Sequence, residues 1–298
     1  MKTFFTCPDG GVTGIADCWR ECRMGERCAP LSFLHEAGRE REWKGKPSCT
    51  QLLNGTRMSY LMLTTEWGIS PQDATWQILG SAGHAVMERA AEVEHAEIEI
   101  DLWDITGHCD FIEVNSDGSV DLYDYKVVGS YAVAKALGVT VEKDPMLDND
   151  GNPMLWRGRP RYKSRVVLDS EKADLRDWKW QVNFYRWGLW HAFKPVRRQR
   201  LFLVARDGGT VTARGYGVMQ NFYMVDVPAI AEEVVREHFE PRREALLSAL
   251  HTSKCPAPCS AEEAWNGNRC RSYCAVAGAC VARGDNPYIS ETGGETDE

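Results

Sequence analysis

No stretch of the 298-residue sequence reaches the run of about 18 apolar residues that a membrane-spanning helix needs. The first residues, MKTFFTCPDG, lack the apolar segment of a secretory signal, so we expect a cytoplasmic protein. The helicase nucleotide-binding motif G-x-x-x-x-G-K-[ST] is also missing. Basic residues are not in excess, because 35 Lys and Arg stand against 43 Asp and Glu, so binding to nucleic acid would depend on local basic patches.

The residues that are present predict a globular α/β protein, with 43% apolar residues and 11 Trp for a packed core. Hydrophobic periodicity predicts a helix over 71–95, a strand over 97–105, a hairpin over 107–128, a helix over 173–193 and a strand over 200–206. This order, helix, three strands, helix, strand, indicates a small mixed sheet flanked by helices. The segment 130–172 reads as a long connection.

Four segments are expected. They are an N-terminal cysteine module (1–48), a core (49–253), a C-terminal cysteine module (254–284) and an acidic disordered tail (285–298).

The hairpin GHCDFIEVNSDGSVDLYDYK carries the candidate chemistry. Asp117-Gly118 predicts a three-residue turn, and that register places Asp110 opposite Asp124. Paired side chains lie about 4.5–5.5 Å apart at Cβ, so both carboxylates could bind one Mg²⁺ or Mn²⁺ ion. Lys126 follows on the same face of the strand. A metal-dependent hydrolytic site is the functional interpretation, and an exposed hairpin with a Lys–Asp ion pair is the structural alternative.

G-x-x-D followed by D-x-K resembles the PD-(D/E)XK nuclease superfamily, in particular its RecB-like branch with a restriction-endonuclease-like core. The resemblance implies that His84, in the helical GSAGHAVME, joins Asp110, Asp124 and the Tyr125 carbonyl around the metal. Lys126 would then orient the attacking water. It also implies that Q-x-x-x-Y, here Gln181 and Tyr185, faces the site and contacts DNA or the lysine.

Basic and aromatic residues alternate in WRGRPRYKSR, where Arg157, Arg159 and Arg161 are candidates to bind DNA phosphates. A solvated loop is the alternative. Basic residues over 194–200 form a second candidate contact.

Eight of the 11 cysteines repeat one spacing, C-x10-C-x3-C-x5-C, in two sets: Cys7, Cys18, Cys22, Cys28 and Cys259, Cys270, Cys274, Cys280. Four thiolates suit either Zn²⁺ or a 4Fe-4S cluster. Cys255 could replace Cys259. RecB-like nucleases include an iron–sulfur branch, in which one early cysteine joins three late ones. Asn54-Gly55 stands where that early cysteine is expected, so two independent sites are the alternative.

The resemblance implies a metal-dependent DNA exonuclease that acts on single-stranded ends. It would be similar to small phage-encoded or CRISPR-associated stand-alone enzymes, with recombination or CRISPR-type proteins as partners. Two alternatives stay open: a non-catalytic metal-cluster protein that binds DNA or a partner, and a nuclease of the same fold that cuts RNA or a defined duplex site.

Overall fold

The computed structural model describes residues 1–40, 42–91, 95–284 and 286–289. Its contacts divide the chain into two compact units. The first unit comprises 1–85, 99–108 and 230–298, and the second comprises 86–98 and 109–229. Most of the expected acidic tail lies outside the described residues. Among the described helices, none is long and apolar enough to cross a membrane.

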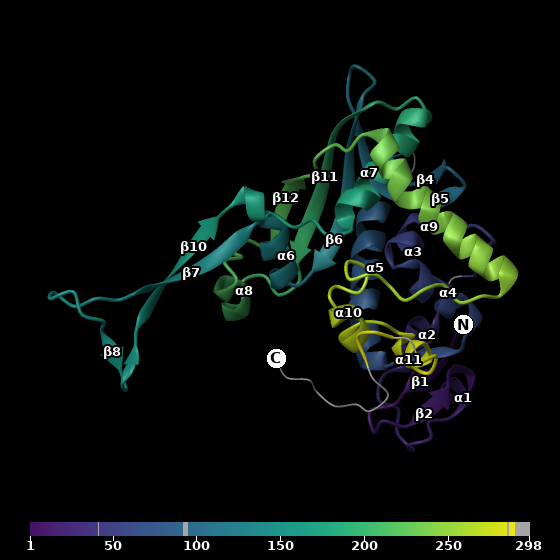
Figure 1. The fold of residues 1–298 in the computed structure, drawn as a ribbon, viewed down its shortest axis with the longest axis horizontal. Coiled ribbons are helices and arrows are strands. Elements are labelled where there is room, and N and C mark those ends of the chain that lie inside the picture. The colour runs from purple at the N-terminus through teal and green to yellow at the C-terminus, as the bar shows by residue number, and fades with distance from the viewer. Residues whose placement is uncertain (41, 92–94, 285, 290–298) are drawn as a thin grey trace. The chain divides into compact units, whose positions relative to one another are not determined.

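A mixed five-stranded sheet carries the hairpin, in the order β12-β11-β6-β5-β4 (Figure 1). Strand β6 runs antiparallel to β5 and parallel to β11, and β12 closes the edge antiparallel to β11. A mixed α/β architecture is therefore confirmed. The strands are β4 (Ala96–Leu102), β5 (Ile105–Val114), β6 (Val120–Val128), β11 (Val196–Ala205) and β12 (Phe222–Asp226).

The turn between β5 and β6 forms as expected. The Asn115 N–H donates to the Ser119 carbonyl at 2.8 Å, which closes a loop over 116–118. Gly118 in this loop has a φ of 82°, a conformation that glycine adopts at little cost. The register pairs Val114 with Val120 and Phe111 with Tyr123, which is the register that the sequence predicts.

Helix α7 (Trp178–His191) packs against β11 and connects back to the sheet. It begins five residues later than expected, because 173–177 form a bend that ends at Asp177. It buries Val182, Phe184 and Leu189. Between α7 and β6 lie α6 (Ser130–Leu137) and a short 3-10 helix (Ser170–Lys172), while α8 (Val211–Gly215) follows β11.

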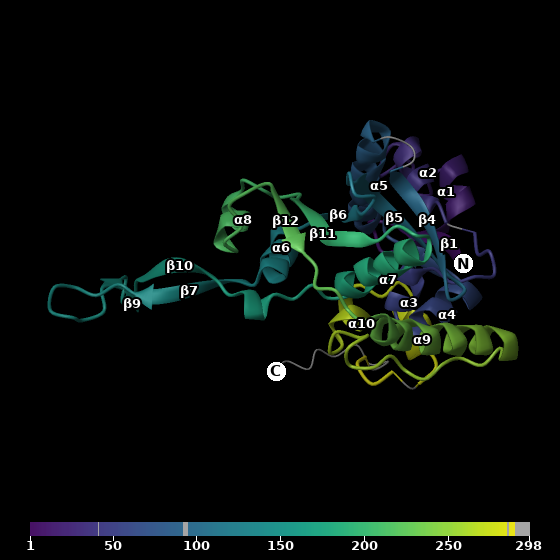
Figure 2. The same cartoon turned by 90° about the horizontal axis from the view of Figure 1, so that it is seen from above.

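The segment 130–172, which the sequence indicated only as a long connection, contains regular structure. Beyond α6 it forms a long antiparallel hairpin, which we call the arm (139–168) (Figure 2). Nearly every side chain of the arm is exposed, so its strands lack the alternation of buried and exposed residues that reveals a strand in a sequence. The arm contains β7 (Val139–Pro145), β8 (Leu155–Trp156), β9 (Arg159–Pro160) and β10 (Tyr162–Leu168).

Asp207 caps helix α6 from a distant position in the sequence. Its carboxylate accepts hydrogen bonds from the Ser130 N–H at 2.7 Å and the Ser130 hydroxyl at 2.6 Å. These bonds lower the pKa of Asp207. We expect Asp207→Ala to lower the free energy of unfolding by about 1 kcal/mol, as lost caps do.

The contribution of this cap should depend on pH in one direction. The stabilisation by the cap is complete above about pH 3.9, the ordinary pKa of Asp. It is lost as the pH falls through the lower pKa that Asp207 has in the folded protein. Urea denaturation at pH 7 and pH 3 measures both effects, with the exposed Asp150→Ala as the control. Equal stability of wild type and Asp207→Ala at pH 7 would refute the cap.

In the first unit, a three-stranded sheet and two short helices enclose a small core. The strand order is β2-β1-β3, and the core joins Phe5, Ile15 and Leu34 to Ala74 of helix α5 (Pro71–Ala90). The surrounding elements are β1 (Lys2–Thr6), β2 (Val12–Gly14), β3 (Trp67–Ile69), α1 (Ile15–Arg20) and α2 (Leu31–Gly38).

Helix α9 (Glu232–Thr252) of the first unit continues through Pro241 without a break. Helices α3 (Cys49–Leu53) and α4 (Thr56–Thr64) pack against α9. The C-terminal cysteine segment adds α10 (Asn268–Ser272) and α11 (Ala277–Val281).

Candidate metal centres

The two hairpin carboxylates lie on adjacent strands. Continuing the observed register by one residue places Asp110 of β5 opposite Asp124 of β6. Asp110 is 8% exposed, and its Oδ2 accepts the Tyr125 N–H at 2.6 Å. This bond ties the carboxylate to the neighbouring strand and so fixes its position.

Asp124 and Lys126 form an ion pair on one face of β6. The Lys126 Nζ lies 2.6 Å from Asp124 Oδ2, and the two side chains are 16% and 1% exposed. The alternation of a strand puts residues two apart on the same face, as the sequence predicts. The ion pair holds the ammonium beside the buried carboxylate.

A third acidic residue, Glu97 of β4, forms a cluster with His84 and Asp110. The sequence predicted His84 and Asp110 as metal ligands but not Glu97. One ligand atom each from His84, Glu97 and Asp110 lies within 4.8 Å of the other two. One imidazole and two carboxylates suit a hard or borderline divalent cation such as Mg²⁺ or Mn²⁺. Asp124, expected as a ligand, is outside this group, and its carboxylate pairs with Lys126 instead.

Glu97 has an unusual backbone. Its φ is 50°, a left-handed conformation that costs a non-glycine residue about 1–3 kcal/mol. Such residues redirect a strand's side chains and gather at functional sites. In the sequence EIEIDL, acidic and apolar residues alternate strictly. The pattern therefore does not distinguish Glu97 from the exposed Glu99.

Gln181 and Tyr185 lie one turn apart on α7 and contact each other. The Gln181 Nε2 donates to the Tyr185 hydroxyl at 2.8 Å. Tyr185 is only 2% exposed and Gln181 is partly buried. The spacing therefore produces one hydrogen-bonded pair on one helix face.

The three arginines predicted to bind phosphate lie near the tip of the arm, where all are exposed. Trp156 beside them is 65% exposed, and the Arg157 guanidinium lies 5.7 Å from its ring centre. The second basic candidate, at 194–200, is less available. Arg197 forms a bidentate pair with Asp121, and Arg200 pairs with Asp226.

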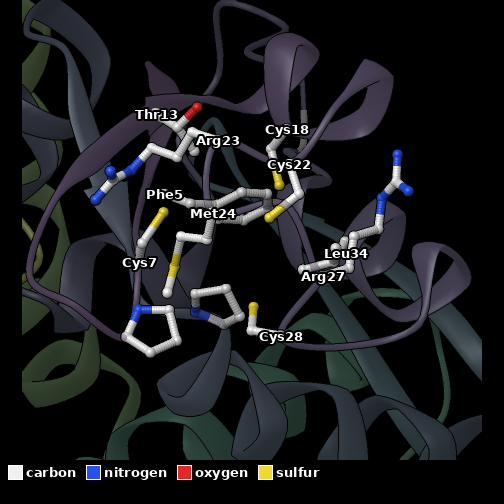
Figure 3. Close-up of a pocket in the computed structure, with 12 residues that line it drawn as sticks. Phe5, Cys7, Thr13, Cys18, Cys22, Arg23, Met24, Arg27, Cys28 and Leu34 are labelled. Atoms are coloured by element: carbon white, nitrogen blue, oxygen red, sulfur yellow. The ribbon is translucent and has the colours of Figure 1, made fainter.

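The two cysteine sets line two separate cavities in the first unit. Cys7, Cys18, Cys22 and Cys28 surround one of them (Figure 3). Cys259, Cys270, Cys274 and Cys280 surround the other, and Cys255 does not line it. Burial raises the pKa of Cys259 to about 11, with Glu263 adding to the shift.

Helix α4 and the loop before it form the other wall of the C-terminal cavity. Arg57 and Met58 line it, and a Cβ added at Gly55 would lie 3.3 Å from the Cys259 sulfur. The buried Arg269 donates to the Asn54 side chain at 2.7 Å and so ties this segment to the cysteine module. Cys259 thus lies beside the position where the resemblance expected an early cysteine.

Comparisons with known proteins do not assign a family. No protein-family model matches the chain, and no curated protein matches it. Among solved structures, the crystal structure of SSO0001 is similar, with 15% identity and a TM-score of 0.41 over 84% of this chain and 93% of that chain. A TM-score of this size assigns no fold.

Proposed function

We propose that this protein is a divalent-metal-dependent nuclease that hydrolyses phosphodiester bonds in DNA. The observation that carries the proposal is the grouping of His84, Glu97 and Asp110, with the Asp124–Lys126 pair on the strand next to Asp110. The order α5, β4, β5, β6, α7, β11 supports a restriction-endonuclease-like core.

The donor set fits Mg²⁺ or Mn²⁺. His84, Glu97 and Asp110 would hold the ion, the Tyr125 carbonyl would be a further oxygen ligand, and Asp124 would stay paired with Lys126. When bound, the ion would polarise a phosphoryl oxygen and make water a better nucleophile. Asp110 needs no rearrangement for this role, because the Tyr125 N–H already fixes its carboxylate.

Lys126 supplies the positive charge that hydrolysis of a phosphodiester requires. Negative charge builds up on the phosphoryl oxygens in the transition state, and a fixed cation stabilises it more than the ground state. Asp124 holds the ammonium in place at 2.6 Å. Lys126 would also orient the attacking water by donating a hydrogen bond to it.

DNA would contact the arm. Exposed arginines bind phosphates, and exposed aromatic rings such as Trp156 stack on unpaired bases. This combination favours single-stranded DNA or DNA ends, and hence an exonuclease. Gln181 would contact the DNA strand, held in place by its hydrogen bond to the buried Tyr185.

Replacing Arg157, Arg159 and Arg161 together with Ala should weaken binding to single-stranded DNA. Three lost phosphate contacts should reduce the slope of log affinity against log salt by about 2. The cleavage rate at saturating DNA should not change, because these residues lie outside the metal cluster. Fluorescence anisotropy at several salt concentrations measures the slope.

Arg165→Ala is the matched control, because Arg165 belongs to the arm but pairs with Glu142 at 2.6 Å. A slope that does not change in the triple variant would show that DNA binds elsewhere.

The C-terminal cavity would hold a 4Fe-4S cluster or, alternatively, Zn²⁺. Its cysteines come after α9 and lie beside α4 and the loop before it, so a metal group there would staple this late segment to the one that precedes α5.

The test of function is cleavage of end-labelled substrates with Mn²⁺ and with EDTA. Single-stranded DNA, duplex DNA and RNA of the same sequence compete in one reaction. Preferential, Mn²⁺-dependent shortening of DNA from an end is the expected result. Preference for RNA, or one internal cut in the duplex, would indicate the other nucleases of this fold. DNA binding without cleavage would indicate a non-catalytic protein.

A further inference from the structure

The N-terminal cysteines form a built site that the nuclease chemistry does not use. Cys7 follows β1, Cys18 lies in α1, Cys22 follows α1, and Cys28 precedes α2. Their side chains converge on one cavity, and Figure 3 shows the four sulfurs directed into it. The end of β1, helix α1 and the loop between α1 and α2 thus present their thiols to a common centre.

Two of the four cysteines begin matching turns. The Gly10 N–H donates to the Cys7 carbonyl at 2.9 Å, and the Gly25 N–H donates to the Cys22 carbonyl at 3.0 Å. Both glycines have a left-handed backbone, with φ values of 80° and 83°. The sequences CPDG and CRMG therefore fix two sulfurs in the same local geometry. Packing of free thiols does not require such a repeat.

The spacing of the sulfurs favours a four-iron cluster over a single zinc ion. A zinc ion with four sulfurs at about 2.3 Å brings each pair of sulfurs to about 3.8 Å. Across the described residues, which include all four cysteines, no three cysteine sulfurs lie within 4.8 Å of one another. A four-iron cluster binds each thiolate to a different iron and so keeps the sulfurs farther apart.

The walls of the cavity suit a negatively charged cluster. Phe5 and Leu34 are buried and apolar, and they limit access of water on one side. Arg23 and Arg27 line the other side; Arg23 is paired with Asp9, so the positive charge comes from Arg27. Arg27 donates to the carbonyls of Trp19 and Arg20 at 3.1 Å, which keeps its guanidinium at the rim.

We propose that Cys7, Cys18, Cys22 and Cys28 bind a four-iron, four-sulfide cluster that is separate from the C-terminal cysteine site. Each thiol loses its proton on ligation, and the cluster crosslinks β1, α1 and the segment before α2. This inference does not depend on nuclease activity. It depends on the cavity, the paired turns and the sulfur spacing.

The full chain, purified without oxygen, should contain about eight irons and eight sulfides if both cysteine cavities hold four-iron clusters. The double variant Cys22→Ala/Cys28→Ala should lose about four irons and four sulfides, which are those of the N-terminal cluster. These two cysteines are outside the buried core, so the change leaves the packing intact. Cys255→Ala, which alters a thiol of neither cavity, should keep the wild-type content.

Cys274→Ala separates the two sites, because it should remove the C-terminal metal and leave the N-terminal cluster. The iron, sulfide and zinc content of this variant tests the N-terminal site alone. The proposal is supported if Cys274→Ala contains four irons and four sulfides and loses them when Cys22 and Cys28 are also changed to Ala. It is overturned if Cys274→Ala contains one zinc ion that is lost in the same way, or if it contains no metal.

Discussion

Lys126→Met should reduce the rate of DNA cleavage by at least about 10²–10³-fold, the usual cost of removing one charge-stabilising donor from an active site. The reason is the position of the ammonium, which lies 2.6 Å from Asp124 on the strand beside Asp110. Affinity for DNA should change little, because binding would rest mainly on the arm. Single-turnover cleavage of labelled single-stranded DNA measures the rate.

Loss of Lys126 also has a structural effect that the experiment must separate from catalysis. The variant leaves the buried Asp124 carboxylate without its ammonium, and breaking a buried pair costs about 3 kcal/mol or more. The double variant Lys126→Met/Asp124→Asn removes both charges and should recover stability without recovering cleavage. Recovery of cleavage in the double variant would show that Lys126 is structural. Lys172→Ala, an exposed lysine in the same unit, is the control.

Glu97→Gln should weaken Mn²⁺ binding by about 100-fold or more. Replacing a residue that only hydrogen-bonds to a metal ligand already lowers metal affinity by about 10–100-fold, and Glu97 would be a ligand itself. The amide keeps the size and the backbone conformation of Glu97 and removes only the charge. Cleavage should fall in parallel unless Mn²⁺ is raised. Electron paramagnetic resonance of free Mn²⁺ gives the affinity directly.

Glu99→Gln is the matched control, since Glu99 is two residues away on the same strand but exposed. Asp124→Asn provides the decisive comparison. If Asp124→Asn removes Mn²⁺ binding and Glu97→Gln does not, the metal is held by the two hairpin carboxylates, as the sequence alone suggested. The opposite result assigns the ion to Glu97, Asp110 and His84.

The hairpin could be predicted because its signals are local. Asp117-Gly118 sets the turn, and the turn sets which residues face each other across β5 and β6. The pairing of Asp110 with Asp124 and the position of Lys126 follow by counting. The helices around Gln181 and His84 were predictable for the same reason, since helical spacing fixes which side chains share a face.

Glu97 and the arm could not be predicted because their signals are not local. The role of Glu97 depends on a left-handed backbone within a strand, which only the folded sheet imposes. The arm has almost no buried side chains, so it leaves no hydrophobic period. Likewise, the sequence indicates Arg197 as a DNA contact. In the folded protein Arg197 pairs with Asp121, which is 76 residues away in the sequence.

The rate of nucleotide release from single-stranded DNA, measured against Mn²⁺ concentration, tests the central claim most directly. The proposed site requires a rate that is zero with EDTA, rises to saturation with Mn²⁺, and stays near zero for Lys126→Met/Asp124→Asn purified in parallel. A rate that EDTA does not change would contradict a metal-dependent nuclease site at this hairpin. Equal rates for the wild type and the double variant would contradict it as well.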